Sequence, residues 1–265
     1  EYRRQRQMCI RDSVEKNRTL VAIDNFYIVA REQGAENPSI PTWANSDSNP
    51  AQFSARPDEV TKKEIPNVPG AFQLLNFLSK PECDKLIQIS EALGYLEDAA
   101  VSLPRKIRHN SNVTWVTDET TTDLLWERGK PFFAVDNNLT QKMFPIGLNA
   151  RFRFYRYQTG DYFGPHTDGA WPGSKVMNKQ LITNGNNDRL SLRSCIVFLS
   201  DGYTGGRTDF YSRTEPRKKI SVKTPLGAAL CFPHGAHPEH CLHSSEIIST
   251  GVKYIIRTDI LYSSD

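Results

Sequence analysis

From Asn149 to the C-terminus, apolar and polar residues alternate in short runs that Gly, Asp, Asn and Pro interrupt. A period of two predicts β-strands, because successive side chains of a strand point to opposite faces. We predict eight strands, over residues 151–158, 162–168, 192–200, 207–211, 219–223, 228–233, 240–244 and 252–262. The stretch 170–190 shows no periodicity and is expected to be a functional lid or a disordered loop.

Before residue 149 the clearest pattern is helical. Apolar residues between Leu86 and Leu93 recur at helical spacing. Ser79, with Glu82 three residues later, has the spacing of a capping box, and Gly94 is a natural helix end. We therefore predict a helix that begins near residue 80 and ends at residue 94.

Other early segments complete the predicted architecture. A strand is expected over 71–78 and a second helix over 121–128. Residues 1–13 differ in composition from the rest and are expected to be a non-native or disordered tail, and 14–66 an N-terminal extension with a strand or two. The domain itself is predicted over 67–265. Eight short strands after a helical part favour a mostly β protein, a sandwich or jelly roll with buttressing helices.

Composition excludes several classes of protein. The 33 Lys and Arg residues nearly balance 30 Asp and Glu, so no nucleic-acid partner is expected. No apolar run approaches the roughly 18 residues of a membrane span. Five scattered cysteines without a CxxC pair predict reduced thiols and an intracellular, cytoplasmic protein. The oligomeric state is not predictable from this sequence.

Chemistry concentrates in a His-x-Asp sequence at the end of the second predicted strand. Residues two apart in a strand share a face, so His166 and Asp168 can direct an imidazole and a carboxylate to one point. A second histidine from another strand would complete a 2-His-1-carboxylate set, which suits non-haem iron(II).

The third ligand has four candidates, because His234, His237, His240 and His243 recur at every third residue. A tract of this kind is also compatible with a zinc site or an exposed loop. Spacing alone leaves these alternatives open.

Four ordered motifs resemble the prolyl-4-hydroxylase-type branch of the Fe(II)/2-oxoglutarate dioxygenases. The pattern Y-x2-G-x2-F-x2-H-x-D is met over 157–168, and GGxTxF over 205–210. The V-x2-P-x-G pair is met over 222–227 and H-x7-G-x-K over 243–253. The resemblance covers about residues 70–262.

This resemblance implies a double-stranded β-helix (a cupin-like jelly roll) with iron(II), 2-oxoglutarate and O2, and ascorbate as a further cofactor. It assigns His166, Asp168 and His243 to the metal and Lys253 to the distal carboxylate of 2-oxoglutarate. His240 is the alternative third ligand. The implied reaction is hydroxylation of an unactivated C–H bond, with release of succinate and CO2.

One position departs from the family pattern. Many relatives have a Tyr that helps to hold 2-oxoglutarate where this chain has Phe198. We expect another group to replace it, and the candidates are Ser194, Thr208 and Tyr157. Arg257 shares a strand face with Lys253 and could take the role of Lys253 or pair with the substrate.

The substrate is the least determined part of the prediction. Candidate substrate-binding residues are Arg108, Asn110, Arg153, Trp171 and Arg193, each of which has a structural role as its alternative. Several arginines near one pocket favour a carboxylate-bearing substrate, either a peptidyl residue or a small amino-acid-like molecule. The alternative functions are oxidative demethylation of nucleic acid on the same iron site, and a non-catalytic jelly-roll or zinc-binding module. Salt-dependent nucleic-acid binding would identify the first and metal analysis the second.

Overall fold

The computed structural model describes residues 23–55, 59–100, 103–139, 141–186, 188–213, 215 and 218–264. The predicted tail over 1–13 lies outside the described residues. All eight predicted strands are present, with ends shifted by up to three residues. They are β8 (Arg151–Tyr157), β9 (Tyr162–His166), β12 (Arg189–Phe198), β14 (Thr208–Tyr211), β15 (Lys219–Val222), β16 (Ala229–Pro233), β17 (His243–Ser245) and β19 (Lys253–Ser263).

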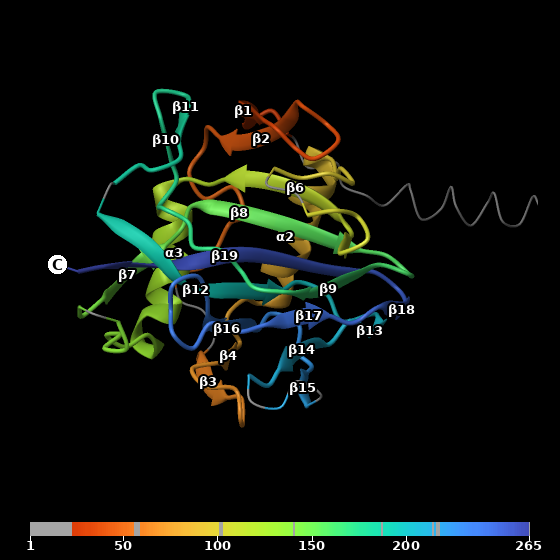
Figure 1. Ribbon diagram of the computed structural model, residues 1–265. Coiled ribbons are helices and arrows are strands. Elements are labelled where there is room, and N and C mark those ends of the chain that lie inside the picture. Colours follow the sequence, from red (N-terminus) through yellow and green to blue (C-terminus); the bar gives the residue numbers. More distant parts are fainter. Residues whose placement is uncertain are drawn as a thin grey trace, which may run out of the picture.

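These strands form two sheets that face each other (Figure 1). The large sheet contains β8, β19, β12 and β16 side by side, and the small sheet contains β15, β14, β17 and β9. Along the chain the strands pass from one sheet to the other and back, with β14 and β15 as the one consecutive pair in the same sheet. This connectivity is that of a jelly roll, or double-stranded β-helix, so the predicted fold class is confirmed.

Strands from the first half of the chain extend both sheets. In the large sheet β6 pairs with β8, β2 runs parallel to β6, and β4 pairs with β16. The added strands are β1 (Phe26–Glu32), β2 (Ile40–Asn45), β3 (Thr61–Glu64), β4 (Phe72–Leu75), β5 (Arg108–His109), β6 (Ser111–Val116) and β7 (Phe144–Leu148). The extension over 14–66 thus contributes three strands, rather than one or two. Strands β5 to β7 were not predicted.

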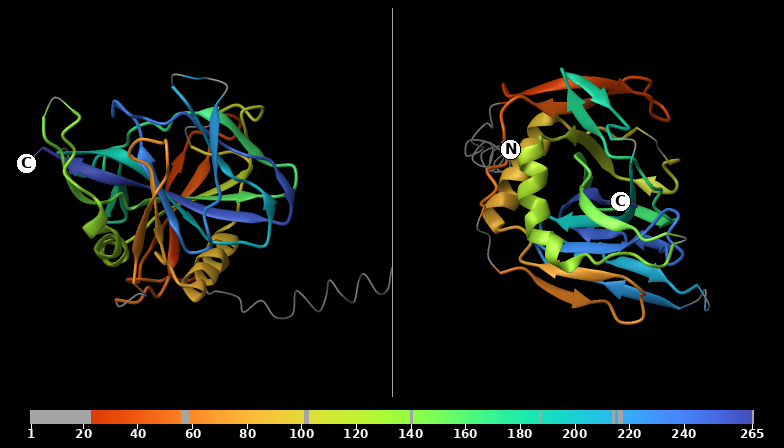
Figure 2. Two further views of the ribbon diagram at one scale, coloured as in Figure 1. Left: turned by 90° about the horizontal axis from the view of Figure 1, so that it is seen from below. Right: turned by 90° about the vertical axis from the view of Figure 1, so that its left-hand side faces the viewer.

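Two helices cover one face of the large sheet (Figure 2). Helix α2 (Lys80–Leu93) begins with the predicted capping box, in which Ser79 and Glu82 each hydrogen-bond the backbone of the other. Helix α3 (Glu119–Gly129) is followed by the short 3-10 helix η1 (Lys130–Phe132). Both helices pack their apolar side chains on the sheet, which fixes the wall that carries the site.

Side-chain alternation divides the large sheet into two faces. Phe152 and Phe154 of β8 pack in the core beneath the helices, with Cys195 of β12. Tyr155 and Tyr157 belong to a second core between the two sheets. The residues of odd number in β8 and β19 therefore face the interior of the jelly roll.

The stretch 170–190 is not an irregular loop. It contains a β-hairpin, β10 (Lys175–Met177) paired with β11 (Gln180–Ile182). The two turn residues, Asn178 and Lys179, both have positive φ, at 50° and 58°. A lysine at positive φ is uncommon, and Asn-Lys is not one of the residue pairs from which a two-residue hairpin turn is predicted.

A close backbone approach requires glycine at position 205, the first residue of the Gly-Gly pair. A short two-stranded sheet of β13 (Thr204–Gly205) and β18 (Ile248–Thr250) brings the chain against the Ile247 carbonyl. Gly205 has a φ of +77°, and a Cβ there would lie 2.2 Å from that oxygen. Any other residue would force these strands apart.

The cysteines among the described residues are unpaired. Cys83, Cys195, Cys231 and Cys241 are buried free thiols. Among the described residues, no helix has the length and apolar character that crossing a membrane requires.

Candidate functional site

Two histidines that are far apart in the sequence lie side by side in the small sheet. His166 of β9 and His243 of β17 are register partners, and their ring centroids are 4.3 Å apart. Asp168 follows β9, and its carboxylate lies 3.6 Å from Nε2 of His166 and 3.8 Å from Nε2 of His243. One ligand atom from each of the three residues lies within 4.8 Å of the others.

Backbone hydrogen bonds set the orientation of both imidazoles. Nδ1 of His166 donates to the Gly164 carbonyl at 2.9 Å, and Nδ1 of His243 to the Cys241 carbonyl at 3.1 Å. Because Nδ1 is bonded to a backbone carbonyl in each ring, Nε2 is the nitrogen that faces Asp168 and is available to a metal. Burial lowers the pKa of His243 to about 4, despite the nearby Asp168, so this ring is neutral at neutral pH.

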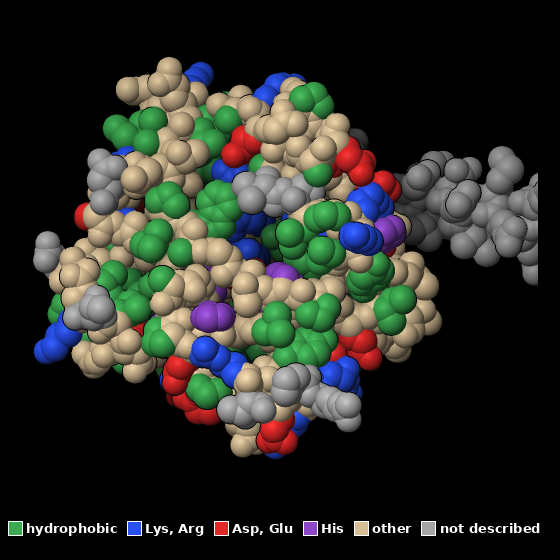
Figure 3. Space-filling view, in the orientation of Figure 1, with side chains coloured by type: hydrophobic (Ala, Val, Ile, Leu, Met, Phe, Trp, Pro, Cys, Tyr) green, Lys and Arg blue, Asp and Glu red, His purple; other side chains and the backbone are tan. Residues whose placement is uncertain are grey.

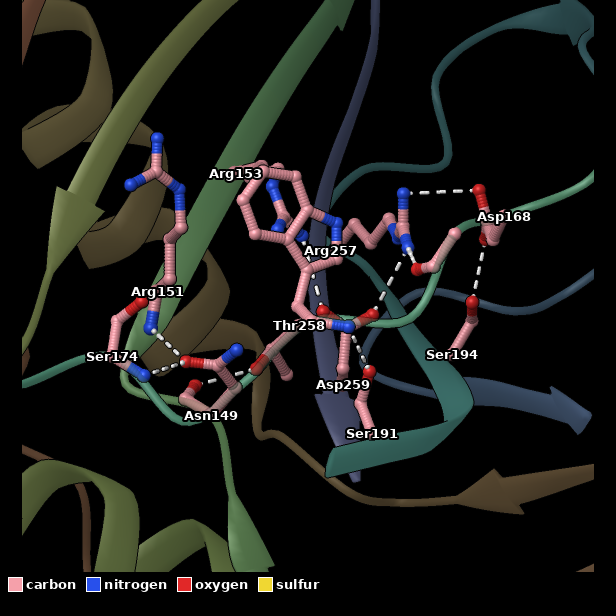
Figure 4. A network of polar contacts seen from close by, with 12 residues as sticks. Asn149, Arg151, Arg153, Asp168, Ser174, Ser191, Ser194, Arg257, Thr258 and Asp259 are labelled. Atoms are coloured by element: carbon pink, nitrogen blue, oxygen red, sulfur yellow. Dashed lines mark hydrogen bonds and ion pairs between the residues drawn. The ribbon is translucent and has the colours of Figure 1, made fainter. Parts of the chain in front are cut away.

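Asp168 is buried and held from two sides (Figure 4). Nη1 of Arg257 lies 3.0 Å from one carboxylate oxygen, and the Ser194 hydroxyl donates to the other at 2.5 Å. Burial alone would raise the pKa of Asp168, but the charge of Arg257, followed by the two histidines, holds it well below the ordinary value. The group is thus an anion in the metal-free protein.

A cavity, here called the inner cavity, runs from this triad toward Lys253. Its walls are largely aromatic and aliphatic, from Tyr155, Phe163, Ile196 and Phe198. Such walls exclude water and strengthen electrostatic interactions inside.

Lys253 also lines the inner cavity and is 1% exposed. Its ammonium donates to the Gly206 carbonyl at 2.7 Å and to the Ser245 hydroxyl at 2.9 Å, but it has no ion-pair partner among the described residues. Burial lowers its pKa to about 7, with a small opposing effect of Glu246. A buried cation without an anion is costly, so this position favours an anionic ligand.

Several of the predicted co-substrate residues surround this lysine. The rings of Tyr157 and Phe198 each lie 5.1 Å from the Lys253 ammonium. Thr208 also lines the inner cavity. Ser245, which the sequence analysis did not select, supplies a hydroxyl beside Lys253 and stands two residues after His243, a spacing that could have identified it.

Two predicted 2-oxoglutarate contacts are placed differently. The Ser194 hydroxyl is hydrogen-bonded to Asp168, as described above, and lies 2.8 Å from Nδ1 of His234. Arg257 lines the cavity, but its guanidinium is paired with Asp168 and, at 3.1 Å, with Asp259. Both residues therefore hold the carboxylate of the triad. Of the two cations predicted to bind 2-oxoglutarate, Arg257 has acidic partners and Lys253 has none among the described residues.

The other histidines of the 234–243 tract do not form a metal site. Nε2 of His234 contacts Ser191 at 2.9 Å, and His237 is bonded to Asp136 at 2.7 Å. Nδ1 of His240 donates to the backbone of His237. Within the described residues, the triad of His166, Asp168 and His243 is the one cluster with metal-binding geometry.

The predicted substrate residues separate into two groups. Arg108, Arg153 and Trp171 line a second cavity beside the triad. Asn110 lies instead next to the Tyr157 hydroxyl and does not line either cavity. Arg193 lines neither cavity and contacts the Tyr262 hydroxyl, the Gly70 carbonyl and Asp136.

Strand alternation explains why Arg193 does not line the site. It could also have identified two residues near the site that were not predicted. Ile196 and Phe198 of β12 face the inner cavity, so odd-numbered Arg193 belongs to the opposite face. Arg151 shares the inward face of Arg153 and lines the same second cavity. Asp259 shares the inward face of Arg257 and pairs with it.

Comparison with known proteins gives distant likenesses in solved structures. No protein-family model and no curated protein matches the chain. A viral collagen prolyl hydroxylase from Paramecium Bursaria Chlorella virus-1, in complex with 2-oxoglutarate, is 20% identical, with a TM-score of 0.48 over 76% of this chain and 99% of that chain. A Pseudomonas putida prolyl-4-hydroxylase is 14% identical, with a TM-score of 0.45 over 72% and 91% of the two chains.

A Burkholderia pseudomallei oxidoreductase of the 2OG-Fe(II) oxygenase family is 12% identical, with a TM-score of 0.41 over 74% of this chain and 85% of that chain. These structures are prolyl 4-hydroxylases and 2-oxoglutarate–Fe(II) oxygenases, the group whose motifs the sequence resembles. At these identities and TM-scores, the function has to be proposed from the residues of the site.

Proposed function

We propose that the protein is an Fe(II)- and 2-oxoglutarate-dependent dioxygenase that hydroxylates an unactivated C–H bond. The observation that carries this proposal is that a His-Asp-His triad and a buried Lys253 without an ion-pair partner among the described residues line one cavity. The substrate class is a peptidyl residue or a small amino-acid-like molecule.

The donor set fits non-haem iron(II). His166, Asp168 and His243 would hold the metal through two imidazole nitrogens and one carboxylate oxygen, a set that leaves positions open for other ligands. The protein fixes the rings through the Gly164 and Cys241 carbonyls before any metal arrives. Metal binding is therefore expected to need little rearrangement of the chain.

We expect a dicarboxylate to occupy the inner cavity between the triad and Lys253, both of which line it. The ammonium of Lys253 would bind the distal carboxylate, with Ser245 and Thr208 beside it. Bound iron and 2-oxoglutarate supply the oxidising chemistry with O2, which converts C–H to C–OH and yields succinate and CO2. The apolar walls keep water from the reacting centre.

The decisive test is an anaerobic titration of the protein with Fe(II) and 2-oxoglutarate, followed by visible absorption. A charge-transfer band near ~500 nm requires the metal and the keto acid together at a site of this kind. We expect the band in the wild type, and its loss in His166→Ala and His243→Ala. His240→Ala is the matched control, because this side chain belongs to the same tract and contacts only backbone among the described groups.

The outcomes separate the parts of the proposal. Iron binding without the band would contradict the 2-oxoglutarate site at Lys253. A band that survives in both triad variants would contradict the metal assignment. Stoichiometric zinc in the isolated protein, with no response to iron, would favour a zinc-binding module instead.

A further inference from the structure

A second cavity of about 320 Å³ lies next to the triad and is here called the arginine chamber. It shares Tyr155, Phe163, His166, Asp168 and Arg257 with the inner cavity, so the triad stands between the two. The space-filling view shows a hollow on this face with Lys or Arg side chains inside it (Figure 3). A volume of this size admits a small molecule or one side chain of a larger one.

Four guanidinium groups line the arginine chamber, and three of them have acidic partners. Arg151 pairs with Glu32 of β1 at 2.6 Å. Arg153 pairs with Asp259 at 3.2 Å. Arg257 pairs with Asp168 and Asp259, as described above.

Arg108 is the fourth, and its side chain has no ion pair or hydrogen bond to any described residue. It is 8% exposed, and its Nη2 atom is buried without a partner. Its guanidinium carbon lies 5.9 Å from the ring of Tyr155 and 5.8 Å from the ring of Phe163. Aromatic faces stabilise a guanidinium but do not satisfy its N–H donors.

The sheet register fixes Arg108 close to the triad. Arg108 of β5 is the partner of Phe163 in β9, so both side chains lie on the same face of the small sheet. The Phe163 ring in turn stacks on the His166 ring, with centroids 3.6 Å apart. A group bound by Arg108 is therefore separated from a metal-ligand ring by one aromatic layer.

The other arginines also leave donors unused in this chamber. Nε and Nη1 of Arg151 and Nη2 of Arg153 are buried without partners. Trp171 covers both guanidinium groups, at 5.5 Å from Arg151 and 4.4 Å from Arg153. The chamber thus presents fixed, desolvated donors and one uncompensated positive charge.

We propose that the substrate carries an oxyanion, a carboxylate or a phosphate, and that Arg108 binds it in the arginine chamber. Guanidinium groups bind both kinds of oxyanion through paired N–H donors, and the ligand would supply the charge that Arg108 lacks. This inference rests on the proposed function, because it names the substrate class of the same site. It distinguishes Arg108, which binds the ligand, from Arg153, whose charge Asp259 already neutralises.

The test is calorimetric titration of metal-free protein with inorganic phosphate and, separately, with acetate. Arg108→Gln removes the charge, and Lys106→Gln removes an exposed charge two residues earlier in the chain. Lys253→Met removes the cation of the inner cavity. We expect Arg108→Gln to weaken binding of the better anion at least about tenfold and Lys106→Gln to retain it, whereas Lys253→Met removes only the contribution of the inner cavity.

Each result decides the question. Absence of anion binding in the wild type, equal affinity in Arg108→Gln, or loss in Lys253→Met alone would overturn the inference. Tighter binding of phosphate than of acetate would point to a phosphate-bearing substrate, and the reverse to a carboxylate. Because no iron is present, this result is independent of the charge-transfer band that tests the proposed function. Thermal unfolding of Arg108→Gln checks its fold, which should be retained because Arg108 has no described acidic partner.

Discussion

The guanidinium of Arg257 is held against the carboxylate of Asp168, with Nη1 and Oδ1 3.0 Å apart and both side chains buried. Ser194 takes the second oxygen of the same carboxylate. Asp168 is therefore oriented by the protein itself, and a metal would meet a carboxylate whose rotation is already restricted. Preorganisation of this kind is typical of metal ligands that must keep one coordination geometry.

Removing Arg257 should destabilise the metal-free fold. In Arg257→Gln, Asp168 and Asp259 both lose a buried cationic partner, and breaking such a pair costs about 3–5 kcal/mol in the free energy of unfolding. Urea unfolding of the metal-free protein measures this. Arg105→Gln, which breaks a more exposed pair with Glu97, should change stability by less than about 0.5 kcal/mol. Equal effects of the two substitutions would contradict the structural role of Arg257.

Removing the Ser194 hydroxyl should weaken metal binding. Ser194→Ala frees one oxygen of Asp168 and takes this partner from Nδ1 of His234, and loss of such a supporting hydrogen bond typically weakens metal affinity about 10–100-fold. Competition titration with Fe(II) under anaerobic conditions gives the affinity. The control is Ser200→Ala, which should bind iron like the wild type. The Ser200 hydroxyl bonds only to the backbone of Val252 and Tyr254. Unchanged affinity in Ser194→Ala would show that Asp168 does not depend on this contact.

Burial of the charged Lys253 side chain is expected to lower the free energy of unfolding of the ligand-free protein. Its pKa of about 7 lies below the ordinary 10.5, so the buried charge penalises the fold fully below pH 7. Between pH 7 and 10.5 the unfolded chain binds more protons than the folded one, and the penalty shrinks as pH rises. Lys253→Met should therefore raise stability, by about 1–4 kcal/mol below pH 7 and by less toward pH 10, while abolishing 2-oxoglutarate binding.

Thermal unfolding of the ligand-free wild type and Lys253→Met across this pH range measures the effect. The control is Lys106→Gln, which removes an exposed lysine and should show no such pH dependence. A variant less stable than the wild type at pH 6 would mean that the Gly206 and Ser245 contacts of Lys253 outweigh the burial of its charge.

The sequence predicted the jelly roll well because short apolar or alternating runs are separated by turn residues along this half of the chain. The run lengths of β8, β12 and β19 suit strands, and the breaks between them agree with the observed ends. The first ligand pair was predictable for the same reason, since His166 and Asp168 are two residues apart. His243 needed the family motif, because the register that places it opposite His166 is a long-range property.

Other features depend on contacts that no local pattern records. Strand β6 alternates polar Asn112 and Thr114 with apolar Val113 and Trp115, and the polar residues are buried because β2 and β8, which are distant in sequence, pair with both edges of β6. Which arginine stays without an acid is decided by acids from distant segments, such as Glu32 of β1 for Arg151. The special position of Arg108 is thus a tertiary property and could not be derived from composition or spacing.

Glu82 joins the two helices and gives the fold a defined acid dependence. Its carboxylate receives both terminal nitrogens of Arg128, at 2.7 and 3.0 Å, and the backbone amides of Ser54 and Ser79. Burial raises the pKa of Glu82, but the Arg128 hydrogen bond and these amides outweigh it and lower the pKa to about 2 from 4.5. The folded protein therefore keeps Glu82 charged where the unfolded chain would protonate it. Its contribution to stability is complete above pH 4.5 and is lost as pH falls toward 2.

Glu82→Gln should lower the unfolding temperature at pH 7, because Arg128 loses its buried anion. The difference from the wild type should shrink between pH 4.5 and 2, where protonation removes the same charge from the wild type. Glu127→Gln on α3, an exposed acid paired with Lys130, provides the control and should lower the unfolding temperature little at any pH. A deficit of Glu82→Gln that stays constant down to pH 2 would mean that packing, rather than the charge of Glu82, connects α2 to α3.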